Sequence, residues 1–254
     1  MSENYFNIEV NNCNIRGIIH RPKKFDYIIL YCYGFIGDRV DCHRLAVEAG
    51  RYFSKNNIAF VRFDCRGSGA SDGDSIEFGY YDLLEDIKAV LEFFKKIYLN
   101  KKFILIGISE GAISASYITQ ICLEKKPSLI LWSPIYRKSN NTKNHKENSS
   151  LEKSLLTSEN AHLSSHAVSS FGLWINYRYF IERNKISDSI NLLTLNNILC
   201  IYGTNDKKVV STIDELTKMK NVDIYKITGA DHLFSSTRNK NMVFKETVNW
   251  INNL

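Results

Sequence analysis

Residues 103–112 read Phe103-Ile104-Leu105-Ile106-Gly107-Ile108-Ser109-Glu110-Gly111-Ala112 and join an unbroken apolar run to Gly-x-Ser-x-Gly. Such a run is typical of a buried parallel strand, and the helical pattern after it predicts a sharp strand-to-helix turn. Ser109 stands at the tip of the turn, where the backbone adopts a sparsely populated conformation. Glycines stand two residues to either side, where side chains would collide as strand and helix pass closely. The pattern predicts a nucleophilic serine at the carboxyl end of a sheet.

A nucleophilic serine needs a base, and the base needs an acid that orients it. Residues 197–203 read as a buried strand, and Asp206 lies in the turn that follows. Residues 222–227 read as another strand, and His232 lies just beyond it. The position after the strand at 127–132 offers no carboxylate that could replace Asp206. Simpler roles compete with this interpretation, since serine often caps helices and aspartate is common in turns.

With nucleophile, acid and histidine in this order, the chain resembles the α/β-hydrolases. More narrowly, it is similar to small serine hydrolases that include cinnamoyl/feruloyl esterases, monoacylglycerol-lipase-like enzymes and serine aminopeptidase-like proteins. The resemblance covers nearly the whole chain and implies an α/β-hydrolase fold, with a mostly parallel eight-stranded sheet, helices on both faces and a helical lid inserted after strand 6. We accordingly expect a core domain from residues 1–136 and 186–254, and a lid or cap at 137–185.

Two further motifs carry the resemblance. Residues 27–35 read as a strand that runs into a tight turn, and the family has His-Gly-x there. By that match the backbone N–H groups of Phe35 and Glu110 form the oxyanion hole. Tyr33 stands where the family usually has histidine, so the turn must be braced differently. The second motif is Asp-x-x-Gly-x-Gly-x-Ser at 64–71, whose glycines permit a tight structural loop.

Apolar strands and helical patterns alternate along the chain. Residues 5–10 and 15–20 predict an antiparallel pair that turns at Asn11-Asn12. Strands that alternate with helices then predict a mostly parallel sheet covered on both faces. The expected strands lie near 27–33, 58–63, 102–107, 127–132, 197–202 and 222–227, and the clearest helices near 80–96 and 240–252.

About sixty residues separate Pro134 from the next core strand, and this region is polar first and aromatic later. Its aromatic residues either fix the insertion to the body or line an acyl or aromatic pocket over Ser109. For the pocket we name Tyr33, Trp132, Phe171 and Trp174. Eight Lys or Arg and four Glu lie between 137 and 185. A solvated face is the simplest explanation, and attraction of an anionic thioester is the alternative.

Composition narrows the function classes. The 254 residues are 44% hydrophobic, enough for a large core, and no apolar stretch or signal-peptide pattern predicts a membrane span or export. We therefore expect a cytoplasmic protein. A net charge of +6 without a recognisable basic module excludes nucleic acid as an expected partner. Six scattered cysteines indicate buried free thiols, and His162 and His166 lack a third metal ligand.

These features predict a serine hydrolase that cleaves a carboxylic ester or thioester through Ser109, Asp206 and His232, with no cofactor and no metal. The expected partner is a small-molecule acyl ester or thioester. An acyltransferase, or a thioesterase for coenzyme A or an acyl carrier protein, would use the same triad. A non-catalytic scaffold with the same fold is the third hypothesis. The acyl group, the leaving group and the oligomeric state stay open.

Overall fold

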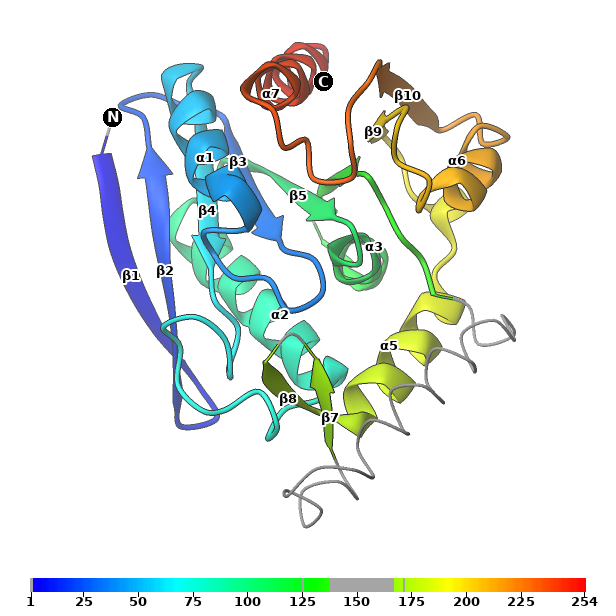
Figure 1. Cartoon of the computed structure of the whole chain (residues 1–254). Coiled ribbons are helices and arrows are strands. Elements are labelled where there is room, and N and C mark those ends of the chain that lie inside the picture. The colour runs from blue at the N-terminus through cyan, green and yellow to red at the C-terminus, as the bar shows by residue number, and fades with distance from the viewer. Residues whose placement is uncertain (1, 125, 138–166, 171) are drawn as a thin grey trace.

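An eight-stranded sheet runs through the computed structural model, which describes residues 2–124, 126–137, 167–170 and 172–254 (Figure 1). Its strands lie in the order β1-β2-β4-β3-β5-β6-β9-β10. Strand β2 is antiparallel to both of its neighbours, and every other neighbouring pair is parallel. The strands are β1 (Ser2–Val10), β2 (Cys13–Arg21), β3 (Tyr27–Cys32), β4 (Ile58–Phe63), β5 (Lys102–Ile108), β6 (Ser128–Trp132), β9 (Ile198–Gly203) and β10 (Val222–Ile227).

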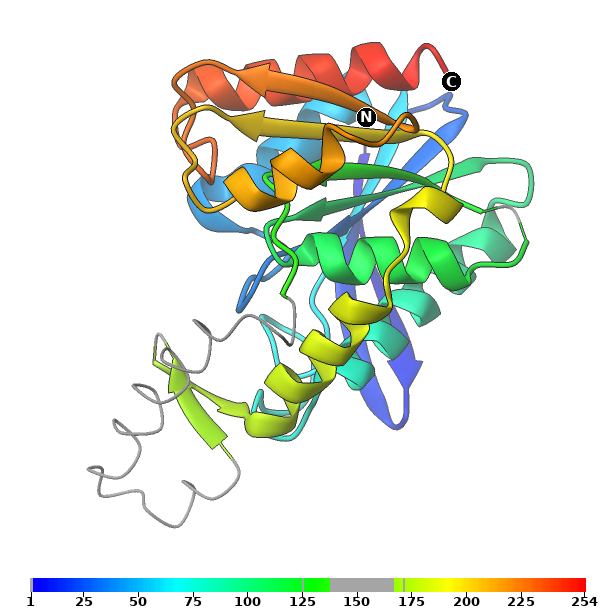
Figure 2. The ribbon, with the colours of Figure 1, turned by 90° about the vertical axis from the view of Figure 1, so that its right-hand side faces the viewer.

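Helices cover both faces of this sheet. Helices α1 (Leu45–Lys55) and α7 (Thr237–Ile251) lie on one face, and α2 (Tyr80–Ile97) and α3 (Gly111–Ile121) lie on the other (Figure 2). Helix α6 (Val210–Leu216) lies between β9 and β10 in the chain, and short 3₁₀ turns occupy Cys42–Arg44 and Leu192–Thr194. The central strands are almost wholly buried because both of their faces are covered, which explains their unbroken apolar sequences.

Each core element lies within a few residues of its expected position. Asn11 and Asn12 both have positive φ, as a two-residue hairpin turn requires, and they join β1 to β2. Helix α7 begins earlier than expected because the Ser236 side chain caps it by accepting a hydrogen bond from the Asn239 amide. The predicted α/β-hydrolase sheet with helices on both faces is confirmed.

The region after β6 differs from a simple helical lid. Residues 138–166 lie outside the described residues, so the lid and the domain division at 137–185 stay predictions. The described remainder holds a hairpin, β7 (Ala167–Ser170) and β8 (Leu173–Asn176), and helix α5 (Tyr177–Ser189). The hairpin extends from the body, while α5 packs on α2 and α3 (Figure 2). The two strands are four residues long, which is too short for a clear alternating pattern.

A buried histidine lies between the sheet and α1. His20 on β2 is fully buried, and its Nε2 accepts a hydrogen bond from the Arg62 guanidinium at 2.8 Å. Gly50 of α1 packs on the ring so closely that a Cβ there would lie 2.4 Å from it. Burial, and then the positive charge of Arg62, lower the pKa of His20 to about 4 from an ordinary 6.5.

This histidine should make folding stability depend on pH. Above pH 6.5 His20 is unprotonated in both the folded and the unfolded chain. Between pH 6.5 and about 4 only the unfolded chain binds the proton, so the folding stability falls as the pH is lowered. The group alone lowers the free energy of unfolding by about 2 kcal/mol between pH 7.5 and 5. Urea titrations should show this loss reduced in His20→Gln, which keeps an acceptor for Arg62. An equal loss in the variant and the wild type would contradict the assignment.

Candidate active site

Close backbone contacts shape the turn that carries Ser109. A Cβ on Gly107 would lie 2.4 Å from the Gly111 carbonyl oxygen, and one on Gly111 would lie 2.2 Å from that of Cys32. Between these glycines Ser109 has φ of 53°, in the left-handed region that side chains other than glycine's seldom allow. The Ser109 amide donates to the Trp132 carbonyl at 3.0 Å, and the Ser109 carbonyl accepts from Ile135 at 3.0 Å. The strained turn is therefore fixed from β6.

The structure brings Ser109, His232 and Asp206 together. The Ser109 Oγ lies 2.9 Å from His232 Nε2, and His232 Nδ1 lies 2.6 Å from an Asp206 carboxylate oxygen. Asp206 is buried, and its other oxygen accepts from the Lys208 amide at 3.1 Å. The loops meet because they follow β5, β9 and β10, whose carboxyl ends lie at one edge of the sheet. With the proton on Nδ1, the ring donates to Asp206 and accepts from the serine hydroxyl.

Asp231 lies next to His232 in the sequence and does not compete for it. Its carboxylate accepts a hydrogen bond from the Ser235 amide at 2.8 Å, which turns it toward the following loop. Asp206 therefore stands alone beside His232 Nδ1 among the described carboxylates that bond to it.

The turn after β3 lies directly against Ser109. The Gly37 amide donates to the Gly34 carbonyl at 3.1 Å, and Ile36 has φ of 52°. A Cβ on Gly34 would lie 3.1 Å from the Ser109 Cβ and 3.6 Å from its Oγ. Within the described residues, neither the Phe35 amide nor the Glu110 amide donates a hydrogen bond to the protein. Both are therefore free to serve a ligand beside the serine.

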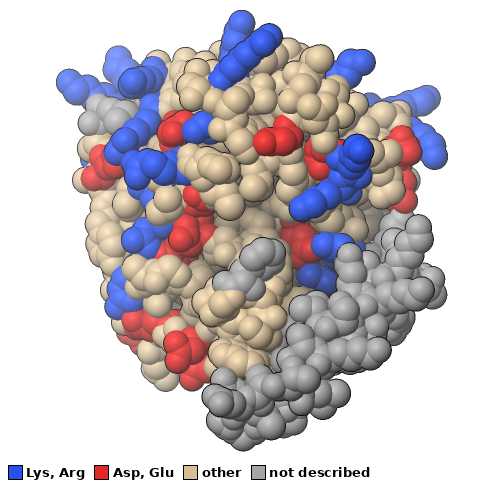
Figure 3. Space-filling model, viewed as in Figure 1, with Lys and Arg blue, Asp and Glu red and all other residues tan. Residues whose placement is uncertain are grey.

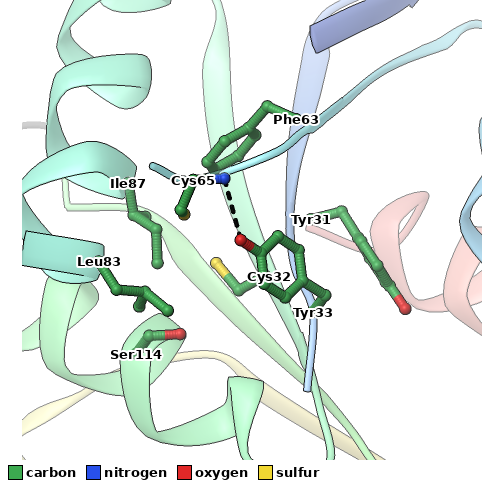
Figure 4. Close-up of a pocket in the computed structure, with 8 residues that line it drawn as sticks. All are labelled: Tyr31, Cys32, Tyr33, Phe63, Cys65, Leu83, Ile87 and Ser114. Carbon is green, nitrogen blue, oxygen red and sulfur yellow. Dashed lines mark hydrogen bonds between the residues drawn. The ribbon is translucent and has the colours of Figure 1, made fainter. Parts of the chain in front are cut away.

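Tyr33 braces this turn in place of the usual histidine. Its hydroxyl accepts from the Cys65 amide at 2.9 Å and lies 2.9 Å from the Ser68 hydroxyl (Figure 4). Burial raises the pKa of Tyr33 well above 10, so the hydroxyl stays neutral. Asp64, which opens the same loop, is fully buried and binds the side chain and the amide of Arg39. The motif at 64–71 thus connects β4 to the chain that follows the Gly34 turn.

The three described residues among the four predicted to line a pocket lie in different surroundings. Trp132 is wrong as a pocket residue: it is fully buried and packs on Tyr31 and Phe244, and its indole N–H donates to Thr247 at 3.2 Å. Tyr33 is also buried, and its hydroxyl accepts a hydrogen bond from the Cys65 amide. Trp174 is half-buried on β8, and Phe171 lies outside the described residues. Figure 4 shows a cavity among the described residues that is lined in part by Tyr33. Its volume is about 10 Å³, which is room for one water at most.

Two arginines that the sequence patterns do not single out contact Glu110. Arg137 Nε lies 2.7 Å from one oxygen of the Glu110 carboxylate, and Arg183 Nη1 lies 2.9 Å from the other. Both belong to the basic set at 137–185, for which a solvated face is the simplest explanation, and for the buried Arg183 that explanation is wrong. Arg178 likewise pairs with Asp82 at 2.6 Å. The available signal was Glu110 itself, because a carboxylate at a buried helix start requires cationic partners.

The aromatic residues of α5 fix that helix to the body. Tyr179 packs on Phe35 and Tyr80 with ring centroids 5.8 and 5.1 Å apart, and Phe180 lies 5.7 Å from Phe35. Of the two expected roles for the aromatic residues of 137–185, Tyr179 and Phe180 thus have the first: they fix the insertion to the body.

Figure 3 shows Lys and Arg gathered over α1, α7 and the β9–β10 side, whereas the middle of this face is largely uncharged.

No group of three or more His, Cys, Asp or Glu among the described residues could hold a metal ion. His162 and His166 lie outside them. No helix in the described part of the chain is long and apolar enough to cross a membrane.

Solved structures with the same fold cover nearly the whole chain. Est1E from Butyrivibrio proteoclasticus, solved with bound ferulic acid, is 17% identical with a TM-score of 0.72, and 98% of each chain is covered. The α/β hydrolase GrgF from Penicillium sp. sh18 is 13% identical with a TM-score of 0.74, over 100% of this chain and 99% of that one. XC6422 from Xanthomonas campestris, an α/β serine hydrolase without a lid, is 14% identical with a TM-score of 0.67, over 99% and 94%. At these identities the likeness shows the fold alone.

A family model supplies the closer relationship. No curated protein sequence matches the chain. The model for serine aminopeptidase, S33, matches residues 37–216, a range that includes Ser109 and Asp206 and ends before His232. Because this match covers more than half of the chain, the protein belongs to the serine aminopeptidase S33 family of α/β hydrolases.

Proposed function

We propose that the protein is a serine hydrolase that cleaves a carboxylic ester or thioester. The observation that carries the proposal is the hydrogen-bonded series from Ser109 through His232 to the buried Asp206, at 2.9 and 2.6 Å. The family match and esterase-like structural neighbours support the same class of chemistry.

The mechanism follows from the positions of these groups. His232 removes the Ser109 proton as Oγ attacks the acyl carbonyl, and Asp206 holds the tautomer and stabilises the imidazolium that forms. The Phe35 and Glu110 amides donate to the developing oxyanion. The tetrahedral intermediate collapses as His232 returns the proton to the leaving group, which leaves an acyl-enzyme. His232 then activates water, which releases the acid and restores the serine.

An acyltransferase would follow the same steps but pass the acyl group to an alcohol, amine or thiol. A carrier-protein or coenzyme A thioester would need cationic groups for its phosphates. Three of the eight basic residues at 137–185 pair with Glu110 or Asp82, so fewer are free for this role than the sequence indicated. We therefore place ester hydrolysis first.

Substitutions in the triad should remove activity toward p-nitrophenyl esters. We expect Ser109→Ala and Asp206→Asn to lower kcat by about 10⁴-fold or more, because the first removes the nucleophile and the second no longer holds the His232 tautomer or stabilises the imidazolium. Asp231→Asn is the matched control, since this neighbour of His232 binds only the following loop and should retain activity. Steady-state kinetics decides the matter, and an active Ser109→Ala would contradict the proposal.

Acceptor competition should separate hydrolysis from acyl transfer. With a p-nitrophenyl ester and an added alcohol, amine or thiol, a hydrolase releases free acid in the same amount as p-nitrophenol. We expect this equality, measured by mass spectrometry of the products. A transferred acyl product that exceeds the free acid would contradict hydrolysis and identify an acyltransferase.

Removal of the Tyr33 hydroxyl should weaken the turn that presents the Phe35 amide. Tyr33→Phe leaves the buried Cys65 amide without its acceptor, which should cost about 1–3 kcal/mol of unfolding free energy. A smaller fall in kcat should accompany it, because the turn after β3 loses a brace. Urea unfolding measures the first effect, and unchanged stability would show that the hydroxyl is not needed.

A further inference from the structure

Glu110 has two distinct parts in the structure. Its backbone amide follows the nucleophile and is one of the two proposed oxyanion donors, while its side chain extends into a buried site. Each carboxylate oxygen binds one guanidinium, Arg137 at 2.7 Å and Arg183 at 2.9 Å. A buried carboxylate is costly unless its charge is matched in this way. The two ion pairs therefore fix the side chain of Glu110 at the start of α3.

Helix α5 reaches both halves of the proposed oxyanion hole. Arg183, itself buried, binds Glu110 and lies with its guanidinium carbon 5.2 Å from the Phe180 ring centroid. Phe180 and Tyr179 in turn pack on Phe35, whose amide is the other donor. One helix from beyond β6 thus contacts the residue of each donor, through an ion pair on one side and aromatic rings on the other.

The charge of Glu110 also matters for the reaction. Glu110 directly follows the nucleophile in the chain, and an uncompensated carboxylate on this residue disfavours a developing oxyanion through like-charge repulsion. Arg137 is partly exposed and is screened by water, whereas Arg183 is buried and is screened less. Arg183 is therefore the stronger partner.

We propose that Arg183 of α5 is a positioning residue for the reaction: by pairing with Glu110 it fixes the Glu110 amide and neutralises the carboxylate of the residue that follows the nucleophile. The inference rests on the proposed serine hydrolase function. It makes α5 a determinant of turnover, although Arg183 transfers no proton.

The test compares two arginines of α5. Arg183→Met keeps the apolar stem over Phe180 and removes the charge, and Arg178→Met removes a pair with Asp82 that fixes the same helix away from Ser109. With p-nitrophenyl acetate we expect Arg183→Met to lower kcat about 10-fold with little change in KM, less than the loss of a whole oxyanion donor. Arg178→Met should stay within about twofold of the wild type.

A double variant distinguishes positioning from simple loss of structure. In Glu110→Gln/Arg183→Met the carboxylate that has lost its buried partner is gone, so kcat should recover by about threefold or more over Arg183→Met alone. Thermal unfolding of every variant shows whether it is folded, and if Arg183→Met does not fold, Arg183→Gln, which also removes the charge, enters the same comparison. Equal losses from the Arg183 and Arg178 variants, or an Arg183 variant as active as the wild type, would overturn the inference. A wild type that releases no p-nitrophenol would instead overturn the proposed function, and this inference with it.

Discussion

The active-site arrangement depends on the close approach of β3, β5 and α3 around Ser109. Glycine is required at 107 and 111 because any Cβ there would overlap backbone atoms of Gly111 or Cys32. The left-handed conformation of Ser109 costs about 1–3 kcal/mol, and the surrounding contacts impose it. The turn directs Oγ toward His232, and within the part of the chain that the structure describes the Glu110 amide has no acceptor. The buried sheet supplies the rigidity that holds this strain.

Polar groups around the turn are fixed by partners from distant parts of the chain. Tyr33 binds the loop after β4, Asp64 binds Arg39, and Glu110 binds arginines at 137 and 183. Each of these buried groups needs its partner, because desolvation without compensation is unfavourable. The site is thus connected to the segment after β6 by ion pairs and aromatic packing, in addition to the covalent backbone.

The core fold and the meeting of the three candidate site residues could be predicted from the sequence because their signals are local. Each signal lies within a few residues of the position that it predicts. These signals are the apolar run of β5, the glycines around Ser109, and the strand ends before Asp206 and His232. Trp132 could not be placed this way, since an apolar residue at a strand end can face either a pocket or the core. Here the core on the α7 side encloses it. The partners of Glu110 lie 27 and 73 residues away, and no periodic pattern connects them.

The central claim is that the fold activates Ser109, and covalent labelling tests it most directly. The wild type and Ser109→Ala would each be treated with a fluorophosphonate, and the intact masses recorded. We expect a single adduct on the wild type and none on the variant, because only a serine deprotonated by His232 attacks the phosphorus readily. An unlabelled wild type, or equal labelling of the two proteins, would contradict it.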